Sequence, residues 1–189
     1  AISDTKKTNK KEGQPEEKAK EILADYECMK LQRAQYERPW QDIRELVRPN
    51  AQDFYRSATK GDTRTENIFD GTAVQANEEL ASALCTYNTS PTERWFSFEI
   101  DDNPQANADK KVRVWLENVA DAVYAEYQDD RTAFNSSMFE DFLDIGSFGN
   151  CVLNQEYNEK EDCLVFRAIP LASTGFCEDQ YGKIDKVYR

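Results

Sequence analysis

Residues 68–98 read IFDGTAVQANEELASALCTYNTSPTERWFSF, in which a helical pattern, a turn and an alternating pattern follow one another. Asp70 is a favourable N-cap residue, and Phe69 before it can close over Val74 as a hydrophobic staple. The helix is predicted to bury one stripe, and its many alanines favour a close approach by another helix or a sheet. The members of this predicted stripe are Ala73, Ala76, Leu80, Ala83, Leu84 and Tyr87.

A turn at Pro91 ends this helix, and apolar and polar residues alternate after it. Such alternation predicts a strand, with Phe96, Phe98 and Ile100 on its buried face. Trp95 falls on the opposite face and therefore needs a cover of its own.

Toward the N-terminus, residues 15–49 show helical spacing that includes Trp40. Pro39 is expected to kink or interrupt this run and Pro49 to end it, which gives two helical pieces. Residues 50–67 are polar and rich in turn formers, so we expect a long loop that a partner orders. Residues 1–14 are predicted to be a flexible basic arm, followed by one folded region over 15–189.

Toward the C-terminus, residues 101–109 are expected to be an acidic loop, followed by an amphipathic helix over 110–128. Its predicted buried positions are Val112, Trp115, Leu116, Val119, Val123 and Tyr127. A shorter helix follows through Phe139, Phe142 and Leu143, and we expect Gly146 and Gly149 to stop it.

The last forty residues change to strand periodicity. They predict one hairpin from residues 151–157 and 163–170, and a second from residues 175–179 and 183–189 in which Gly182 adopts a positive φ. The predicted fold class is therefore α+β, helix-rich with short antiparallel hairpins. Because a sheet that ends on an unpaired strand at Arg189 is a poor terminus, we expect a longer polypeptide.

Composition excludes several kinds of chemistry. The 189 residues contain no histidine, which removes imidazole bases, Ser-His-Asp nucleophiles and mixed Cys/His zinc sites. No glycine-rich phosphate loop occurs, and no apolar run approaches the roughly 20 residues of a membrane span. The five cysteines are widely spaced, which favours reduced thiols in an intracellular protein.

The net charge is −12, and it is unevenly distributed. Residues 1–67 hold 14 basic and 13 acidic side chains, whereas residues 68–189 hold 10 and 23. A surface of this sign repels phosphates and disfavours tight wrapping of DNA. Several carboxylates, such as Glu140, Asp141 and Asp144, could bind a hard cation, but solvated helix faces explain them better.

The order of these elements resembles the N-terminal part of the head-to-tail connecting, or portal, proteins of short-tailed bacteriophages. The resemblance covers roughly residues 35–189, and Gly71 departs from it because glycine weakens the start of a helix. The residues that carry it are Trp40, Asp70, Pro91, Arg94, Trp95, Phe96, Gly146, Gly149, Pro170 and Gly182.

The resemblance implies a structural, non-enzymatic subunit of a closed ring, typically of about 12 copies, at one capsid vertex of the virion. The ring would let DNA pass non-specifically during packaging and ejection, with no cofactor, metal or membrane. This chain would form a peripheral wing-like region that contacts neighbouring subunits, the capsid and scaffold protein. The packaging terminase and the tail adaptor would bind regions beyond it, and assembly would take place in the host cytoplasm.

Two other classes of function remain open on the sequence alone. One is a stand-alone intracellular α+β scaffold or adaptor, which would share every compositional feature. The other is a carboxylate-dependent metal enzyme, which requires acidic residues from separate elements to converge.

Overall fold

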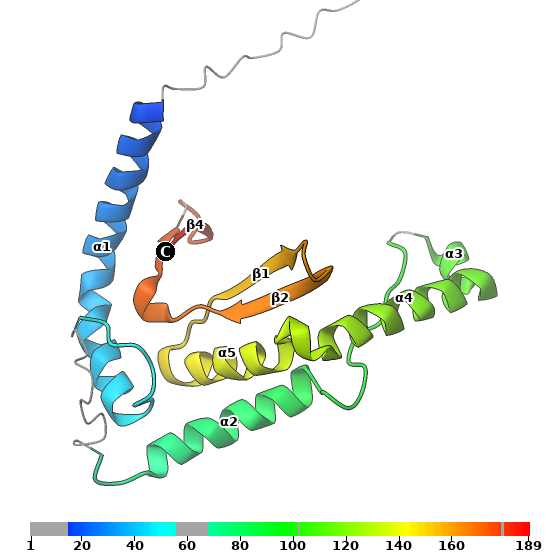
Figure 1. Ribbon diagram of the computed structural model, residues 1–189, viewed down its shortest axis with the longest axis horizontal. Coiled ribbons are helices and arrows are strands. Elements are labelled where there is room, and N and C mark those ends of the chain that lie inside the picture. The colour runs from blue at the N-terminus through cyan, green and yellow to red at the C-terminus, as the bar shows by residue number, and fades with distance from the viewer. Residues whose placement is uncertain (1–14, 56–67, 102, 179) are drawn as a thin grey trace, which may run out of the picture. The chain divides into compact units, whose positions relative to one another are not determined.

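The computed structural model describes residues 15–55, 68–101, 103–178 and 180–189 (Figure 1). The chain divides into a smaller unit, Ala1–Gln35 with Gly175–Arg189, and a larger unit, Tyr36–Thr174. Helices predominate, and the strands form two separate antiparallel pairs. The α+β prediction with short hairpins is therefore confirmed.

Helix α1 runs from Pro15 to Leu46 without interruption. The predicted division at Pro39 is wrong, whereas the helix does end just before Pro49. Proline lacks the N–H that would bond to the carbonyl of Gln35, and the boundary between the two units falls directly after that residue. The turn after Pro39 is held by buried side chains, Gln41 and Arg44, which offset the lost bond.

The smaller unit combines the first part of α1 with a hairpin of β3, Gly175–Glu178, and β4, Ile184–Tyr188. Gly182 has a φ of 73°, so the predicted second hairpin and its positive-φ glycine are both confirmed. Met29 is buried against Gly175 at a distance that leaves little room for a Cβ. Asp25 accepts hydrogen bonds from Lys186 Nζ at 2.6 Å and Tyr188 Oη at 3.1 Å.

In the larger unit, helix α5, Phe134–Phe148, lies between α2, Thr72–Asn88, and a hairpin (Figure 1). The hairpin pairs β1, Leu153–Asn158, with β2, Cys163–Ala168, as predicted. The core of the larger unit is largely aromatic. From α5 to the residues just after β2, the buried hydrophobic side chains are Phe134, Phe142, Phe148, Cys163, Phe166, Ile169 and Leu171.

Helix α2 begins at Thr72 with Gly71 as its N-cap residue, one position later than predicted. Asp70 still binds the helix start, because its Oδ1 accepts from the backbone N of Thr72 at 3.0 Å and from the hydroxyl of Thr72 at 2.7 Å. Phe69 is 96% exposed, so the predicted staple with Val74 is wrong.

The predicted buried stripe of α2 is also wrong, apart from the half-buried Leu84. The buried residues are Asn77 and Ala81, whereas the other members of the predicted stripe are exposed. The face that packs on α5 is therefore displaced by one residue, or about 100° around the helix. Ala73, Ala76 and Ala83 thus lie beside the contact, whereas Ala81 lies within it.

Residues 94–100 form no strand in the described part of the chain. The side-chain amide of Asn107 takes the place of a strand partner for Ile100, with which it makes two hydrogen bonds of 2.9 Å to the backbone N and O. Phe98 and Ile100 remain exposed, so the predicted buried face is wrong.

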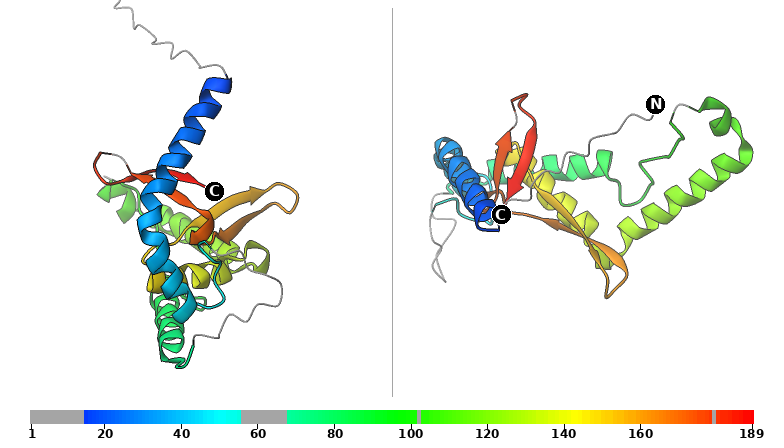
Figure 2. Two further views of the ribbon diagram at one scale, coloured as in Figure 1. Left: turned by 90° about the vertical axis from the view of Figure 1, so that its left-hand side faces the viewer. Right: turned by 90° about the horizontal axis from the view of Figure 1, so that it is seen from above.

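Helix α3, Pro104–Ala108, replaces part of the expected acidic loop and is capped by Asn103. Helix α4, Lys110–Gln128, has the predicted bounds and extends away from α2 and α5 within the larger unit (Figures 1 and 2). Only Ala120 of α4 is buried, and Trp115 is 61% exposed, so Trp115 is not the core residue we expected. A 3₁₀ turn, Asp130–Thr132, joins α4 to α5.

Candidate functional site

The ten residues singled out in the sequence do not form one cluster. Gly182 lies in the smaller unit, and the other nine are distributed over the larger one. They fall into local groups: three beside α4, one on α1, one on α5 and one directly after it, and three at turns. The three at turns are Asp70 before α2, Pro91 after α2, and Pro170 after β2.

Arg94 anchors the segment after α2 to the outer side of α4. Its guanidinium lies 3.4 Å from Asp121 and 3.7 Å from Glu117. Tyr124 donates from its hydroxyl to the backbone O of Ser90, next to Pro91, at 3.3 Å. These contacts hold the turn against the middle of the helix.

Trp95 and Phe96 both contact Tyr127, so the prediction that they lie on opposite faces is wrong. Their ring centroids lie 6.5 and 6.0 Å from that of Tyr127, and 4.9 Å from each other. Tyr127 also stacks on Phe134 at 4.5 Å, and Phe134 meets Phe166 edge-on. The aromatic stretch thus joins α4 to the core of α5 and β2.

Trp40 joins the end of α1 to the residues that follow it. Its ring lies 5.4 Å from Phe54, which in turn meets Phe148 at 5.3 Å. Gln41 accepts from the backbone N of Phe54 and donates to Asp53, both at 2.9 Å. Residues 50–55 are therefore held by contacts within their own chain. Residues 56–67 and 1–14 lie outside the described residues.

Gly146 lies inside α5, where it permits the close approach of α2. A Cβ at this position would overlap Asn77 Oδ1 and lie 3.3 Å from Leu80 Cδ2. The expectation that Gly146 stops the helix is wrong, because the helix ends two residues later. Gly149 is the residue that ends it, in the left-handed conformation with φ 77°.

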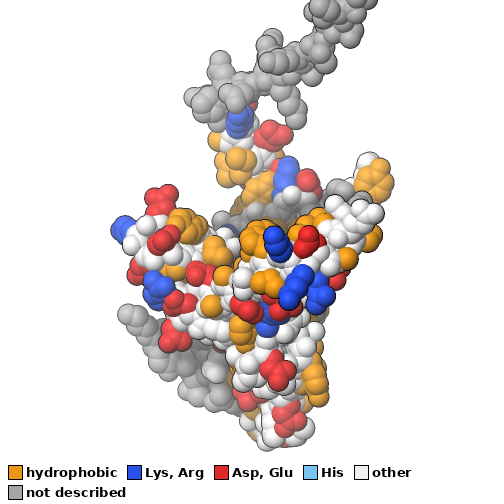
Figure 3. Space-filling view, turned by 90° about the vertical axis from the view of Figure 1, so that its right-hand side faces the viewer, with side chains coloured by type: hydrophobic (Ala, Val, Ile, Leu, Met, Phe, Trp, Pro, Cys, Tyr) orange, Lys and Arg blue, Asp and Glu red, His pale blue; other side chains and the backbone are white. Residues whose placement is uncertain are grey.

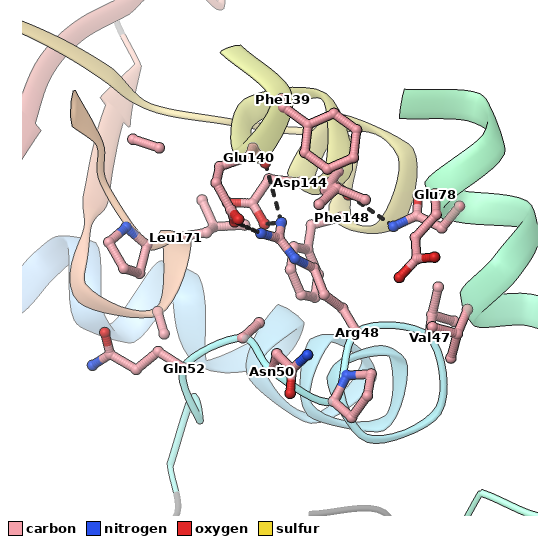
Figure 4. A pocket seen from close by; sticks show the side chains of 18 of the residues that line it. Val47, Arg48, Asn50, Gln52, Glu78, Phe139, Glu140, Asp144, Phe148 and Leu171 are labelled. Atoms are coloured by element: carbon pink, nitrogen blue, oxygen red, sulfur yellow. Dashed lines mark hydrogen bonds and ion pairs between the residues drawn. The ribbon is translucent and has the colours of Figure 1, made fainter. Parts of the chain in front are cut away.

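A groove of about 540 Å³ opens between the end of α1, the first half of α2 and α5 (Figure 4). Phe139, Leu143 and Pro170 contribute apolar walls, and Glu78 and Glu140 contribute carboxylates.

Arg48 stands in this groove and binds two residues of α5. Its guanidinium forms ion pairs with Glu140 and Asp144 and donates to the backbone O of Glu140 at 3.2 Å. These contacts tie the end of α1 to a helix more than ninety residues away in sequence.

Asp141 and Asp144 are buried, so the expectation that these carboxylates are solvated is wrong for both. Burial raises the pKa of each to about 6; the neighbouring Asp144 adds to the shift of Asp141, while Arg48 opposes both shifts. Asp141 is 2% exposed, and its Oδ1 has no hydrogen-bond partner. Burial next to these two acids also raises the pKa of the Cys151 thiol to about 11, which keeps it unreactive.

Among the described residues, no three acidic or cysteine side chains converge on a common metal position. The five cysteines carry free thiols. In the same part of the chain, no helix has the length and apolar character needed to cross a bilayer. The recognisable features are thus packing contacts, a groove and exposed helix faces.

Residues 19–189 match the family model described as bacteriophage head to tail connecting protein. The chain belongs to this family.

Two curated relatives are each 23% identical to this chain. One is a probable portal protein of Bordetella phage BPP-1, aligned over 171 residues, and the other is a portal protein of Salmonella phage epsilon15, aligned over 169. Each alignment covers 89% of this chain and 30% of the relative. The chain therefore spans less than a third of the length of these relatives.

Sequence reasoning missed Arg48, and it did not foresee that Asp141 and Asp144 are buried. The spacing of the two aspartates was a partial signal of their burial. Asp141 and Asp144 are three residues apart, so they lie on one side of α5, close to the core residue Phe142. The basic partner is not local, however, and nothing in the sequence paired Arg48 with α5.

Proposed function

We propose that this chain is part of a structural, non-enzymatic subunit of a phage portal ring, through which DNA is packaged and ejected. The observation that carries the proposal is the family match over residues 19–189. Two relatives that are named as portal proteins or probable portal proteins align with nearly the whole chain and support it.

Within such a subunit, residues 15–189 would form a peripheral wing-like region. Support comes from the surface of the larger unit. Few hydrophobic side chains are buried in its core, whereas α2 and α4 expose large apolar side chains to solvent. These faces suit contacts with neighbouring subunits, the capsid shell and a scaffold protein. The terminase and the tail adaptor would bind other regions of the subunit, and the assembled ring would lie at one vertex of the virion.

The charge of the chain is consistent with DNA that passes without being held. A net charge of −12 repels the phosphate backbone, so this peripheral region would not hold the DNA that passes through the ring. Neither this role nor ring formation needs a cofactor.

Negative-stain images of the complete subunit, purified without other phage proteins, test the proposal. We expect closed rings of about 12 copies with a central hole. Uniform small particles at every protein concentration would favour a stand-alone adaptor and overturn the proposal.

A further inference from the structure

We propose that the exposed face at the start of α4 docks on the exposed stripe of α2 in a second copy of this chain. The α4 face consists of Lys110, Lys111, Val114 and Trp115, and the α2 stripe consists of Ala76, Glu79, Leu80, Ala83 and Tyr87. This inference rests on the proposed ring and names the pair of surfaces that would build it.

Both surfaces present large apolar side chains to solvent. Trp115 is 61% exposed and Tyr87 85%, and Val114 and Leu80 are exposed beside them. Spacings of three and four residues place each group along one side of its helix. In the α2 stripe the alanines leave room between the larger side chains, so a side chain of the size of Trp115 can enter there.

The basic side chains of the α4 face are unfavourable for α4 itself. Lys110 and Lys111 occupy the first turn, which contains no acidic residue, and thus lie at the positive end of the helix dipole. Neither forms an ion pair with a described residue. Only the N-cap Asp109 offsets them locally, through a hydrogen bond to the backbone N of Lys111 at 2.8 Å. A negative partner outside the chain would account for both lysines.

The α2 stripe offers the opposite charge. Glu79 borders it, and the last turn of α2 carries no basic side chain, so the negative end of this helix dipole is not neutralised. Figure 3, which looks at the α3–α4 end, shows basic side chains next to hydrophobic ones. Since residues 68–189 are strongly acidic, two copies repel one another unless a basic surface meets an acidic one.

The two surfaces differ and lie in the same unit, and the proposed ring requires that they join head to tail, in a heterologous contact. Each copy then offers one α4 face and one α2 stripe, and repetition of the contact produces a ring when the rotation closes. A two-fold pair of copies would match both surfaces reciprocally and stop at a dimer, which sedimentation velocity distinguishes from a ring.

Charge reversal tests this pairing in the complete subunit, with assembly measured by sedimentation velocity. The α4 variant carries Lys110→Glu and Lys111→Glu, and the α2 variant carries Glu79→Lys and Ala83→Lys. We expect each variant to weaken association about 100-fold, because like charges then face each other. The α4 variant should melt at the same or a higher temperature, since carboxylates favour the N-terminus of a helix.

Two combinations distinguish a specific contact from general charge effects. One chain with all four substitutions should regain rings. An equimolar mixture of the α4 variant and the α2 variant should also regain rings, in which the two variants alternate, because both contacts between unlike copies have matching charges. Lys160→Glu, in the exposed turn between β1 and β2, is the control and should assemble normally.

Rings that form normally from both variants would overturn the inference and leave the proposed function intact. If the unsubstituted subunit formed no rings, both would fail.

Discussion

Single buried side chains give the larger unit its pH dependence. The pKa of Asp141 and of Asp144 is raised to about 6, above the ordinary value of 3.8 for an aspartate. A raised carboxyl pKa stabilises the fold fully below the unfolded value, and this contribution is lost as the pH rises from about 4 through 6. Asp129 has the opposite effect on stability, because hydrogen bonds from Arg131 lower its pKa to about 2. The stabilisation from this carboxylate is present above pH about 4 and is lost as the pH falls from about 4 through 2.

Asp141→Asn should therefore stabilise the protein at pH 8, by about 1 to 3 kcal/mol, since it removes a buried charge that lacks full hydrogen bonding. Chemical denaturation at pH 5 and pH 8 measures the effect, and the difference between the two pH values should shrink in the variant. The exposed Asp42→Asn serves as the control. A variant less stable than the original chain at pH 8 would contradict this account of Asp141.

Gly146→Ala should destabilise the fold by about 1 to 3 kcal/mol, although alanine is the better helix former. The added methyl overlaps Asn77, whose side chain donates to the backbone O of Leu143 at 3.2 Å. Thermal melts measure the loss. Gly71→Ala is the matched control, because nothing lies within 4 Å of its Cβ position.

If the close approach is the cause, adding Asn77→Ala to Gly146→Ala should recover part of the lost stability. Equal melting temperatures for the Gly146 and Gly71 variants would show that α2 and α5 do not need the glycine.

At the scale of helices and strands, the contact between the end of α1 and α5 depends on Arg48, which lies in the turn after α1. Arg48→Met should destabilise the larger unit by about 3 to 5 kcal/mol, because it leaves Asp144 buried without its cation. Urea denaturation measures this change. Adding Asp144→Leu should restore much of the stability, whereas additive losses in the double variant would mean that the two residues act independently.

Elements with a complete local signal were predictable from the sequence. Helix α4 matched its predicted bounds because Asp109 and the amphipathic period agree, and both hairpins followed from their turn residues. Pro39 misled the prediction, since buried contacts of Gln41 and Arg44 outweigh the local cost of a proline. Residues 94–100 alternate like a strand, but no neighbouring strand exists among the described residues to pair with them.

The face by which α2 packs could not be derived from its own composition. The most apolar stripe of α2 and its buried face are offset by one residue in the sequence. Gly146 has no side chain, so it leaves room for Asn77 where α2 and α5 come closest. A local rule places the most apolar side inward. In this helix the apolar side is left beside the core, where a second copy can cover it.

For the entire chain, the resemblance to a family predicted more of the fold and the function than the local sequence pattern of any single helix or strand. It rested on the order of helices, turns and hairpins, and the family model confirms it over residues 19–189. Its ten marker residues serve mainly as turns, caps and packing points. Arg94, Trp95 and Phe96, for example, fix the segment after α2 along α4.

The most direct test of the portal assignment is a cryo-electron microscopy reconstruction of the complete subunit assembled alone. We expect a closed ring in which residues 36–174 lie at the periphery, with the start of α4 from one copy against α2 of the next. A monomeric or open assembly, or a ring in which these residues line the channel, would contradict the account.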